Sequence, residues 1–254
     1  MKGAIIGDVI GSSYEFNNTF TYGFQLLTEN TDFTDDTICT VSIADALMSD
    51  KDYTHSLRKW CRRYPDPMGA YGPSFKQWVF SEQNYSNNSF GNGALMRLSP
   101  IVLSNMDIYS AKQEAYKATK CSHAHSKALK CVDIFVEICY ALKNGRQKEA
   151  ATKIMVKYFG YDWIQSIPKM GEFDETCQGT LPLAVYLFYK STGFEDAIRL
   201  AVSYGGDSDT LAAVVGTLSE IYYGVPEKLW ERIKEYLPDE FLSVVDRFYA
   251  ILQK

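Results

Sequence analysis

The apolar residues of this sequence recur mostly at the spacing of an α-helix. Segment 35–48 is typical, because its apolar side chains return every three or four residues and Thr34 precedes it as a natural helix N-cap. Its stripe consists of Ile38, Val41, Ala44, Asp45 and Met48. The same spacing predicts further helices in segments 108–120, 125–142, 146–159, 179–191, 194–203, 209–223 and 238–252.

Start and stop signals support several of these predicted helices. Asp107 stands where segment 108–120 needs an N-cap, and the helix stop signal Asn144-Gly145 follows segment 125–142. Strand-like alternation is short and rare, and no β-α alternation, linker or tandem repeat appears. We therefore predict an all-α fold that forms one domain over residues 1–254. Residues 61–93 hold the most Gly, Pro, Asn and Ser, which predicts the longest loops there.

Composition and charge narrow the class of protein. Of the 254 residues, 46% are hydrophobic and 22% are charged, which is ordinary for a water-soluble domain. The net charge is −5, and no basic block exceeds Arg58-Lys59 and Arg62-Arg63, so we expect no broad nucleic-acid binding. No apolar run approaches the roughly 18 residues of a membrane span. Asp8 interrupts the apolar start of the chain, so we read no signal peptide there.

The six cysteines favour a reducing environment. No two of them form a C-x-x-C pair, and their spacing suggests no zinc site. Several lie within apolar helical patterns, where a free thiol acts as a small hydrophobic side chain. We therefore expect a cytoplasmic protein. The lack of heptads leads us to expect a monomer.

Two short acidic sequences each stand at the start of a predicted helix. Residues 34–37 read TDDT, and residues 205–210 read GGDSDT. Either one alone is explained equally well as a helix cap, because Asp and Thr are favoured N-caps and acidic side chains complement the helix dipole. Capping is therefore the competing interpretation of each sequence.

A divalent cation explains the two sequences together. One cap needs one side chain, yet each sequence offers two carboxylates and a Thr hydroxyl, with no Lys or Arg within one helical turn. Buried carboxylates without partners are unfavourable. Carboxylate and hydroxyl oxygens suit Mg²⁺, Mn²⁺ or Ca²⁺ rather than zinc. Four carboxylates from two helix starts would hold one or two such ions.

The first fifteen residues combine a packing signal with a carboxylate. Gly3, Gly7 and Gly11 are spaced by four, so one helix face is bare, and close helix packing is the simplest interpretation. Glu15 follows the last of these glycines, and we expect it in a mobile loop. A carboxylate there would reach a metal-bound water or a substrate hydroxyl.

Two further sequences offer groups for ligand binding. Residues 89–97 read SFGNGALMR, with an Asn-Gly turn signal before a helix start, where free backbone N–H groups would face an anion such as a pyrophosphate. An ordinary turn is the competing interpretation. Residues 122–125 read SHAH, and without a third soft ligand nearby a polar helix start is the simplest interpretation.

In this order, these motifs resemble those of the ADP-ribosylglycohydrolase family. The sequences that carry the resemblance are GDVIGSSYE, FTDDT, GNGALMR, SHAHSKAL and GGDSDTLAAVVGTLSEIYYG, and they extend from Gly3 to about Trp230. The resemblance implies an all-α orthogonal helical bundle with a dinuclear magnesium site in a central cleft. It also implies hydrolysis of the bond between ADP-ribose and a modified acceptor.

The resemblance also assigns roles to individual residues. The implied ligands of two Mg²⁺ ions, for which Mn²⁺ can substitute, are Thr34, Asp35, Asp36, Asp207, Asp209 and Thr210. The implied substrate contacts are Ser89, Phe90, Gly91, Asn92 and Gly93 on the diphosphate and adenosine side and His123 along the bound ADP-ribose. The implied carboxylates for proton transfer are Glu15, Asp36 and Asp207.

These roles lead to one mechanistic hypothesis and leave two alternatives. In the hypothesis, the magnesium ions orient the ribose and lower the pKa of a water, which attacks the anomeric carbon while a carboxylate takes its proton. The alternatives are an ADP-ribose- or nucleotide-binding regulator without useful turnover, and a metal-dependent hydrolase of another nucleotide-linked substrate. The acceptor is an ADP-ribose-modified protein or small molecule, and its linkage to Arg, Ser, nucleic acid or another group stays open.

Overall fold

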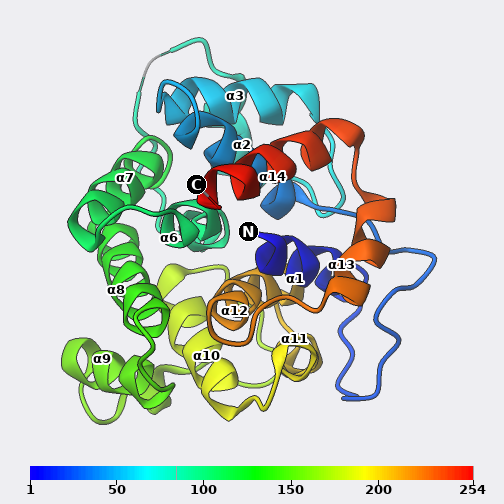
Figure 1. Cartoon of the computed structure of the whole chain (residues 1–254), viewed down its shortest axis with the longest axis vertical. Coiled ribbons are helices and arrows are strands. Elements are labelled where there is room, and N and C mark those ends of the chain that lie inside the picture. The colour runs from blue at the N-terminus through cyan, green and yellow to red at the C-terminus, as the bar shows by residue number, and fades with distance from the viewer. Residues whose placement is uncertain (84, 254) are drawn as a thin grey trace.

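Helices make up the regular structure of the computed structural model, which describes residues 1–83 and 85–253 (Figure 1). Within these residues, extended pairing is limited to isolated bridges, so the predicted all-α class is confirmed. The α-helices are α1 (Lys2–Ser12), α2 (Asp35–Leu47), α3 (Tyr53–Arg63), α4 (Pro73–Phe80), α5 (Gly93–Met96), α6 (Ser99–Leu103), α7 (Ile108–Lys120), α8 (Ser126–Lys143), α9 (Glu149–Phe159), α10 (Cys177–Lys190), α11 (Phe194–Tyr204), α12 (Ser208–Tyr223), α13 (Glu227–Ile233) and α14 (Asp239–Leu252). Two 3₁₀ turns, η1 (Trp163–Ser166) and η2 (Lys234–Tyr236), join them.

Every segment predicted to be helical contains a helix, with ends shifted by up to three residues. The predicted N-caps act as such, since the Thr34 side chain accepts a hydrogen bond from the N–H of Asp36, and Asp107 caps α7. The largest shift is at α9, which begins at Glu149 rather than at residue 146. Gly145 has a φ of 76° that ends the preceding helix, so three further residues are needed before a new helix starts.

Residues 61–93 are less irregular than their composition predicts. Of the described residues, 64–72, 81–83 and 85–92 do lie in loops, but α4 lies between residues 72 and 81. Pro73 stands at the first turn of α4, where its fixed φ favours a helix, and Phe75 and Trp78 are buried beneath it. The apolar stripe predicted for residues 35–48 is only part of the buried surface of α2. The helix is buried on nearly every side.

The closest helix contact joins α1 to α12, which lie side by side (Figure 1). A Cβ atom added to Gly3 would collide with the backbone of Gly216, and one added to Gly7 would collide with that of Ala212. Gly11 lies in the same way against Asp209. The residue numbers of these contacts fall along α12 as they rise along α1, so the two helices are antiparallel. The interpretation of these glycines as a packing face is confirmed.

Around this pair, α12 also packs against α2, α5, α8, α10 and α11. The buried apolar residues form one cluster that extends from Met1 to Phe248. All six cysteines are free thiols, and five of them are buried. Among the helices of the described residues, none has both the length and the apolar character needed to cross a membrane.

The glycine face of α1 gives a direct test of this packing. We expect Gly7→Ala to lower the free energy of unfolding by about 1–3 kcal/mol, because the added methyl group has no space against the backbone of α12. Urea unfolding followed by circular dichroism would measure the change. Gly23→Ala is the control, because a Cβ at Gly23 meets no atom within 4 Å. Equal stability of the two variants would contradict the close contact.

Candidate active site and metal centre

A cleft of about 440 Å³ lies where the end of α1 meets the starts of α2 and α12. The remaining lining residues are Phe16, residues 69–75, Ser89, residues 91–93, Met96, Arg97, His123 and Glu175. Most of the residues singled out in the sequence line it. These are Glu15, Asp35, Asp36, Ser89, Gly91, Asn92, Gly93, His123, Asp207, Asp209 and Thr210.

The two acidic helix starts meet in this cleft, although about 170 residues separate them in the sequence. The Thr210 hydroxyl of α12 donates a hydrogen bond to Oδ1 of Asp36 on α2, at 3.1 Å. Carboxylate oxygens of Glu15, Asp207 and Asp209 all lie within 4.8 Å of one another. Three separate segments of the chain thus direct acidic side chains to one place.

The carboxylates of the cleft lack the partners that buried acids normally have. Oε2 of Glu15, Oδ2 of Asp36 and Oδ1 of Asp209 are all buried, and no protein group in the described part of the chain donates a hydrogen bond to them. Nor does any Lys or Arg of those residues form an ion pair with the site's carboxylates. An oxygen-lined site of uncompensated negative charge fits a hard divalent cation.

Burial also shifts the acid–base behaviour of these groups. It raises the pKa of Asp35, Asp36 and Asp209 well above the ordinary value for Asp, and the neighbouring negative charges raise it further. Burial and the charge of Asp207 raise the pKa of Glu15 to about 8. Each group would lose a proton more easily beside a cation, because an adjacent positive charge favours the carboxylate form.

Asp8 supports the site from behind its lining, and we did not single it out as a functional residue from the sequence. It is fully buried on α1, and its carboxylate accepts hydrogen bonds from the backbone N–H and the hydroxyl of both Thr34 and Thr37. A side chain from α1 therefore fixes the first turn of α2. The signal was an acidic residue inside the apolar Gly-x-x-x-Gly helix, where a charge without a partner is unfavourable.

Thr34 and Glu15 differ from what the sequence led us to expect. Thr34 is fully buried and does not line the cleft, since its hydroxyl donates to Asp8 and accepts from the Asp36 N–H. The loop after α1 is tied rather than free. The Asn18 side chain donates to the Glu15 carbonyl and exchanges hydrogen bonds with the backbone of Gly206, just before α12.

Residues 89–93 form a wall of the cleft, but they offer fewer free backbone donors than expected. The N–H of Gly91 donates to the Ser89 hydroxyl, and the N–H of Asn92 donates to the Glu175 carbonyl. Of the N–H groups of Gly91, Asn92 and Gly93, only that of Gly93 has no hydrogen bond within the described residues. The expectation of a backbone cradle for an anion is therefore only partly correct.

Two side chains of this segment also have defined positions. The Asn92 amide donates to Oδ2 of Asp207 at 2.7 Å and to the Thr180 hydroxyl at 3.0 Å, so it orients a carboxylate of the site. Phe90 does not line the cleft; its ring is 44% exposed and lies beside His125.

The two histidines of the SHAH sequence have different positions. The imidazole of His125 caps α8 by accepting a hydrogen bond from the Lys127 N–H, which confirms a polar helix start. His123 is buried and lines the cleft.

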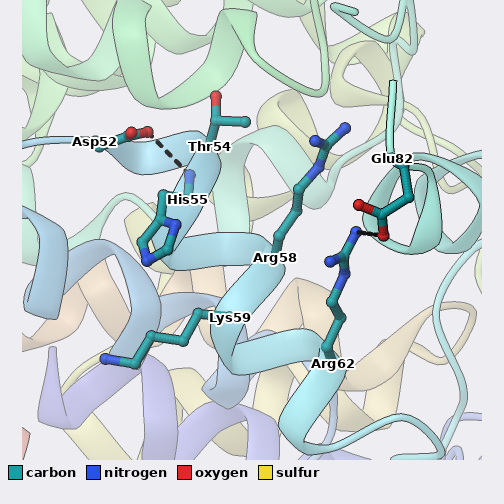
Figure 2. Close-up of a pocket in the computed structure, with 7 residues that line it drawn as sticks. All are labelled: Asp52, Thr54, His55, Arg58, Lys59, Arg62 and Glu82. Carbon is teal, nitrogen blue, oxygen red and sulfur yellow. Dashed lines mark hydrogen bonds and ion pairs between the residues drawn. The ribbon is translucent and has the colours of Figure 1, made fainter. Parts of the chain in front are cut away.

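The most basic stretch of the sequence lies away from this cleft, in a separate hollow along α3 (Figure 2). The guanidinium group of Arg58 donates a hydrogen bond to the carbonyl of Gln83. That of Arg62 donates to the carbonyls of Val79 and Ser81 and forms an ion pair with Glu82. These two guanidinium groups therefore hold the end of α4 and the residues after it. None of the acidic site residues lines this hollow.

Comparison with known proteins finds similarity over nearly the whole chain. The family model described as ADP-ribosylglycohydrolase matches residues 1–254. ADP-ribosylarginine hydrolase Tri1 of Pseudomonas putida is 25% identical over 260 residues, which cover 89% of this chain and 70% of that protein. ADP-ribosyl-[dinitrogen reductase] glycohydrolase of Rhodospirillum rubrum is 21% identical, and the match covers 96% of this chain and 88% of that protein. ADP-ribosylhydrolase ARH3 of Homo sapiens is also 21% identical, and the match covers 100% of this chain and 93% of that protein.

A solved structure has the same fold. The ADP-ribosylglycohydrolase-related protein complex superimposes with a TM-score of 0.77 at 24% sequence identity, and the match covers 98% of this chain and 95% of that chain. The likeness extends over the whole helical bundle.

The raised pKa values predict how stability depends on pH without a cation. A carboxyl whose pKa is raised on folding stabilises the protein fully below its unfolded pKa near 4, and this contribution disappears as the pH rises through the folded pKa. Those values are about 6 for Asp8 and about 8 for Glu15. In EDTA, we therefore expect a lower Tm at about pH 8 than at about pH 5.

Added Mg²⁺ should raise the Tm more at the higher pH, because it binds the ionised carboxylates of the folded state. Differential scanning calorimetry at constant ionic strength would measure both effects, with Na⁺ as the control for general screening. A Tm in EDTA that rises or stays level between these pH values, together with no response to Mg²⁺, would contradict a cation site here.

Proposed function

This chain belongs to the ADP-ribosylglycohydrolase family, and we propose that it hydrolyses the glycosidic bond between ADP-ribose and a modified acceptor at a dinuclear magnesium site. Family membership supports the hydrolase activity. The observation that carries the metal dependence is the set of buried, unpartnered oxygens on Glu15, Asp36 and Asp209, which converge from three segments of the chain. An acidic cleft of this kind is unfavourable for the folded chain unless a cation neutralises it.

The residues that would hold the ions come from the two helix starts. Asp35 and Asp36 belong to the first turn of α2, while Asp209 and Thr210 belong to that of α12, with Asp207 just before it. Thr34 fixes the position of this set, because its hydroxyl donates a hydrogen bond to Asp8 and accepts one from the N–H of Asp36. When bound, Mg²⁺, or Mn²⁺ in its place, supplies Lewis-acid chemistry that orients the ribose hydroxyls and lowers the pKa of a water.

Glu15 is the carboxylate that we assign to proton transfer from the attacking water. Asp36 and Asp207 belong to the set that would hold the ions, and each already accepts one hydrogen bond, from Thr210 and from Asn92 respectively. Oε2 of Glu15 has no partner among the described residues. Without a cation its pKa is raised to about 8, and a cation nearby would lower that value, so the group can accept a proton at neutral pH and release it again.

The other walls of the cleft suit the ADP-ribosyl group. The volume of about 440 Å³ falls within the range of small-molecule sites. We place the diphosphate and adenosine side along Ser89, Gly91 and Gly93, where the wall has small side chains or none. Asn92 holds Asp207 in place rather than contacting the ligand with its amide.

Release of free ADP-ribose is the first test of this function. We expect turnover on a panel of Arg-linked and Ser-linked ADP-ribosyl peptides in Mg²⁺, and none after EDTA treatment, because the cleft acids would then have no counter-charge. Mass spectrometry would identify the product, and added Mg²⁺ should restore the rate. Saturable ADP-ribose binding without turnover on any linkage would instead indicate a binding protein.

The contribution of α12 is tested by Asp209→Asn. We expect turnover to fall by at least about 100-fold, because even the hydrogen-bond partners of metal ligands commonly contribute 10–100-fold. Initial rates in saturating Mg²⁺ would measure the loss, and Asp133→Asn is the control, since this side chain is 46% exposed on α8 and outside the cleft. Full turnover in Asp209→Asn would rule out the proposed ligand set.

A further inference from the structure

Arg97 is a buried cation without a carboxylate partner. Its side chain is fully buried at the end of α5, directly beneath the cleft, and forms no ion pair with any described residue. Nη2 donates to the carbonyl of Ala118 at 3.1 Å and to the hydroxyl of Ser122 at 2.7 Å. Nε and Nη1 have no hydrogen-bond partner among residues 1–83 and 85–253. Burial of a guanidinium charge without a carboxylate partner is energetically unfavourable, which indicates that Arg97 has a specific role.

The contacts of Arg97 lead to one ring nitrogen of His123. The Ser122 hydroxyl accepts from Arg97 and lies 2.9 Å from Nδ1 of His123, and Nη2 of Arg97 lies 3.4 Å from the same Nδ1. A guanidinium group has only donors, and a hydroxyl that already accepts is free to donate its own proton. When the Ser122 hydroxyl donates this proton to Nδ1, the proton of the neutral ring is on Nε2, and the positive charge of Arg97 beside Nδ1 favours this arrangement over an N–H on Nδ1.

The same surroundings exclude the doubly protonated ring. An imidazolium would carry an N–H on Nδ1 that faces the donor Nη2 of Arg97, and its charge would lie beside that of Arg97. Burial first, and then the charge of Arg97, lower the pKa of His123 well below the ordinary value. The ring is therefore neutral at physiological pH.

The free N–H of His123 is directed toward the glycine-rich wall of the cleft. Nε2 has no hydrogen bond to any described residue, and it lies 3.2 Å from the place where Gly93 would carry a Cβ and 3.7 Å from that of Gly91. Because both residues lack side chains, Nε2 is left uncovered. The N–H of Gly93, which also has no hydrogen bond to a described residue, is a further donor of this wall.

We infer that Arg97, directly and through Ser122, holds His123 as the Nε2–H tautomer, so that the cleft presents a fixed donor to a diphosphate oxygen of the ligand. Arg97 is a positioning residue in this account, and His123 is the residue that contacts the ligand. The N–H groups of Gly91 and Asn92 already donate within the protein, so this side chain supplies a hydrogen bond that they cannot give to an anionic oxygen. The identity of the ligand rests on the proposed function, whereas the tautomer does not.

The tautomer is testable in the free protein by ¹⁵N NMR of the imidazole rings. The chain has three histidines, so the spectrum is simple to assign. For His123 we expect Nε2 to be protonated and Nδ1 unprotonated at neutral pH. Arg97→Lys should keep this state because it keeps a donor, whereas Arg97→Met should give a mixture of tautomers. Protonated Nδ1 in the wild-type protein would overturn the inference.

Ser122→Ala is a second variant, should Arg97→Met fail to fold, because it removes only the intervening hydroxyl. We expect it to weaken the preference for the Nε2–H form. Ser126→Ala, an exposed serine at the start of α8, is the matched control and should leave the spectrum unchanged. An unchanged tautomer in Ser122→Ala as well as in Arg97→Met would remove the proposed role of Arg97.

Ligand contact is tested by two replacements that differ in where they place an N–H. The amide of Gln lies near the position of Nε2, whereas that of Asn lies near Nδ1. In calorimetric titrations with ADP-ribose, we expect His123→Gln to keep the Kd within a few-fold and His123→Asn to raise it by about 10-fold or more, as for loss of a hydrogen bond to a charged group.

In turnover assays, His123→Asn should raise KM with little change in kcat, because the contact is made equally in the bound substrate and in the transition state. Tighter binding by the Asn variant than by the Gln variant would overturn the assignment of Nε2. An absence of ADP-ribose binding by the wild-type protein would contradict the proposed function and the ligand contact, while the NMR result would still decide the tautomer.

Discussion

The antiparallel contact between α1 and α12 is the constraint on which the site depends. Because Gly3, Gly7 and Gly11 allow backbone to lie against backbone, the end of α1 reaches the start of α12. Glu15 and Asp209 are thereby brought together from opposite ends of the sequence. Any larger side chain on that face would separate the helices and so the carboxylates.

The buried acids of this region perform two different tasks, which their partners distinguish. Asp8 is as deeply buried as Asp209, yet all its contacts are hydrogen bonds from Thr34 and Thr37, and it fastens α2 to α1. Asp209 has an oxygen without any partner. Burial alone does not distinguish an acid with a structural role from an acid of the candidate site. The number of hydrogen bonds that each carboxylate oxygen accepts does distinguish them.

Arg97 shows how the same rule applies to a cation. Positive charge beneath the cleft would be expected to pair with one of the site acids, but the guanidinium group instead donates to a carbonyl and to Ser122. Its charge is therefore not used to neutralise the carboxylates. That task is left to the cations that the acidic cleft would bind, and the arginine acts on the neighbouring histidine.

Local sequence was sufficient for those parts of the fold and site that neighbouring residues determine. The Thr34 and Asp107 caps and the helix end at Gly145 depend on a few adjacent residues, and each was predicted. The role of Asp8 depends on donors 26 and 29 residues away, and the tether of Asn18 reaches Gly206. The occupied N–H of Asn92 likewise depends on residue 175, so sequence spacing could not reveal it.

The long separation between α1 and α12 also orders events during synthesis. At about 5–20 residues per second, the roughly 200 residues between them take on the order of 10–40 s to translate. During that interval the glycine face of α1 lacks the helix against which it packs in the folded protein. The two acidic helix starts cannot meet before α12 has emerged and packed against α1, so binding of an ion at the proposed site would be a late step in folding.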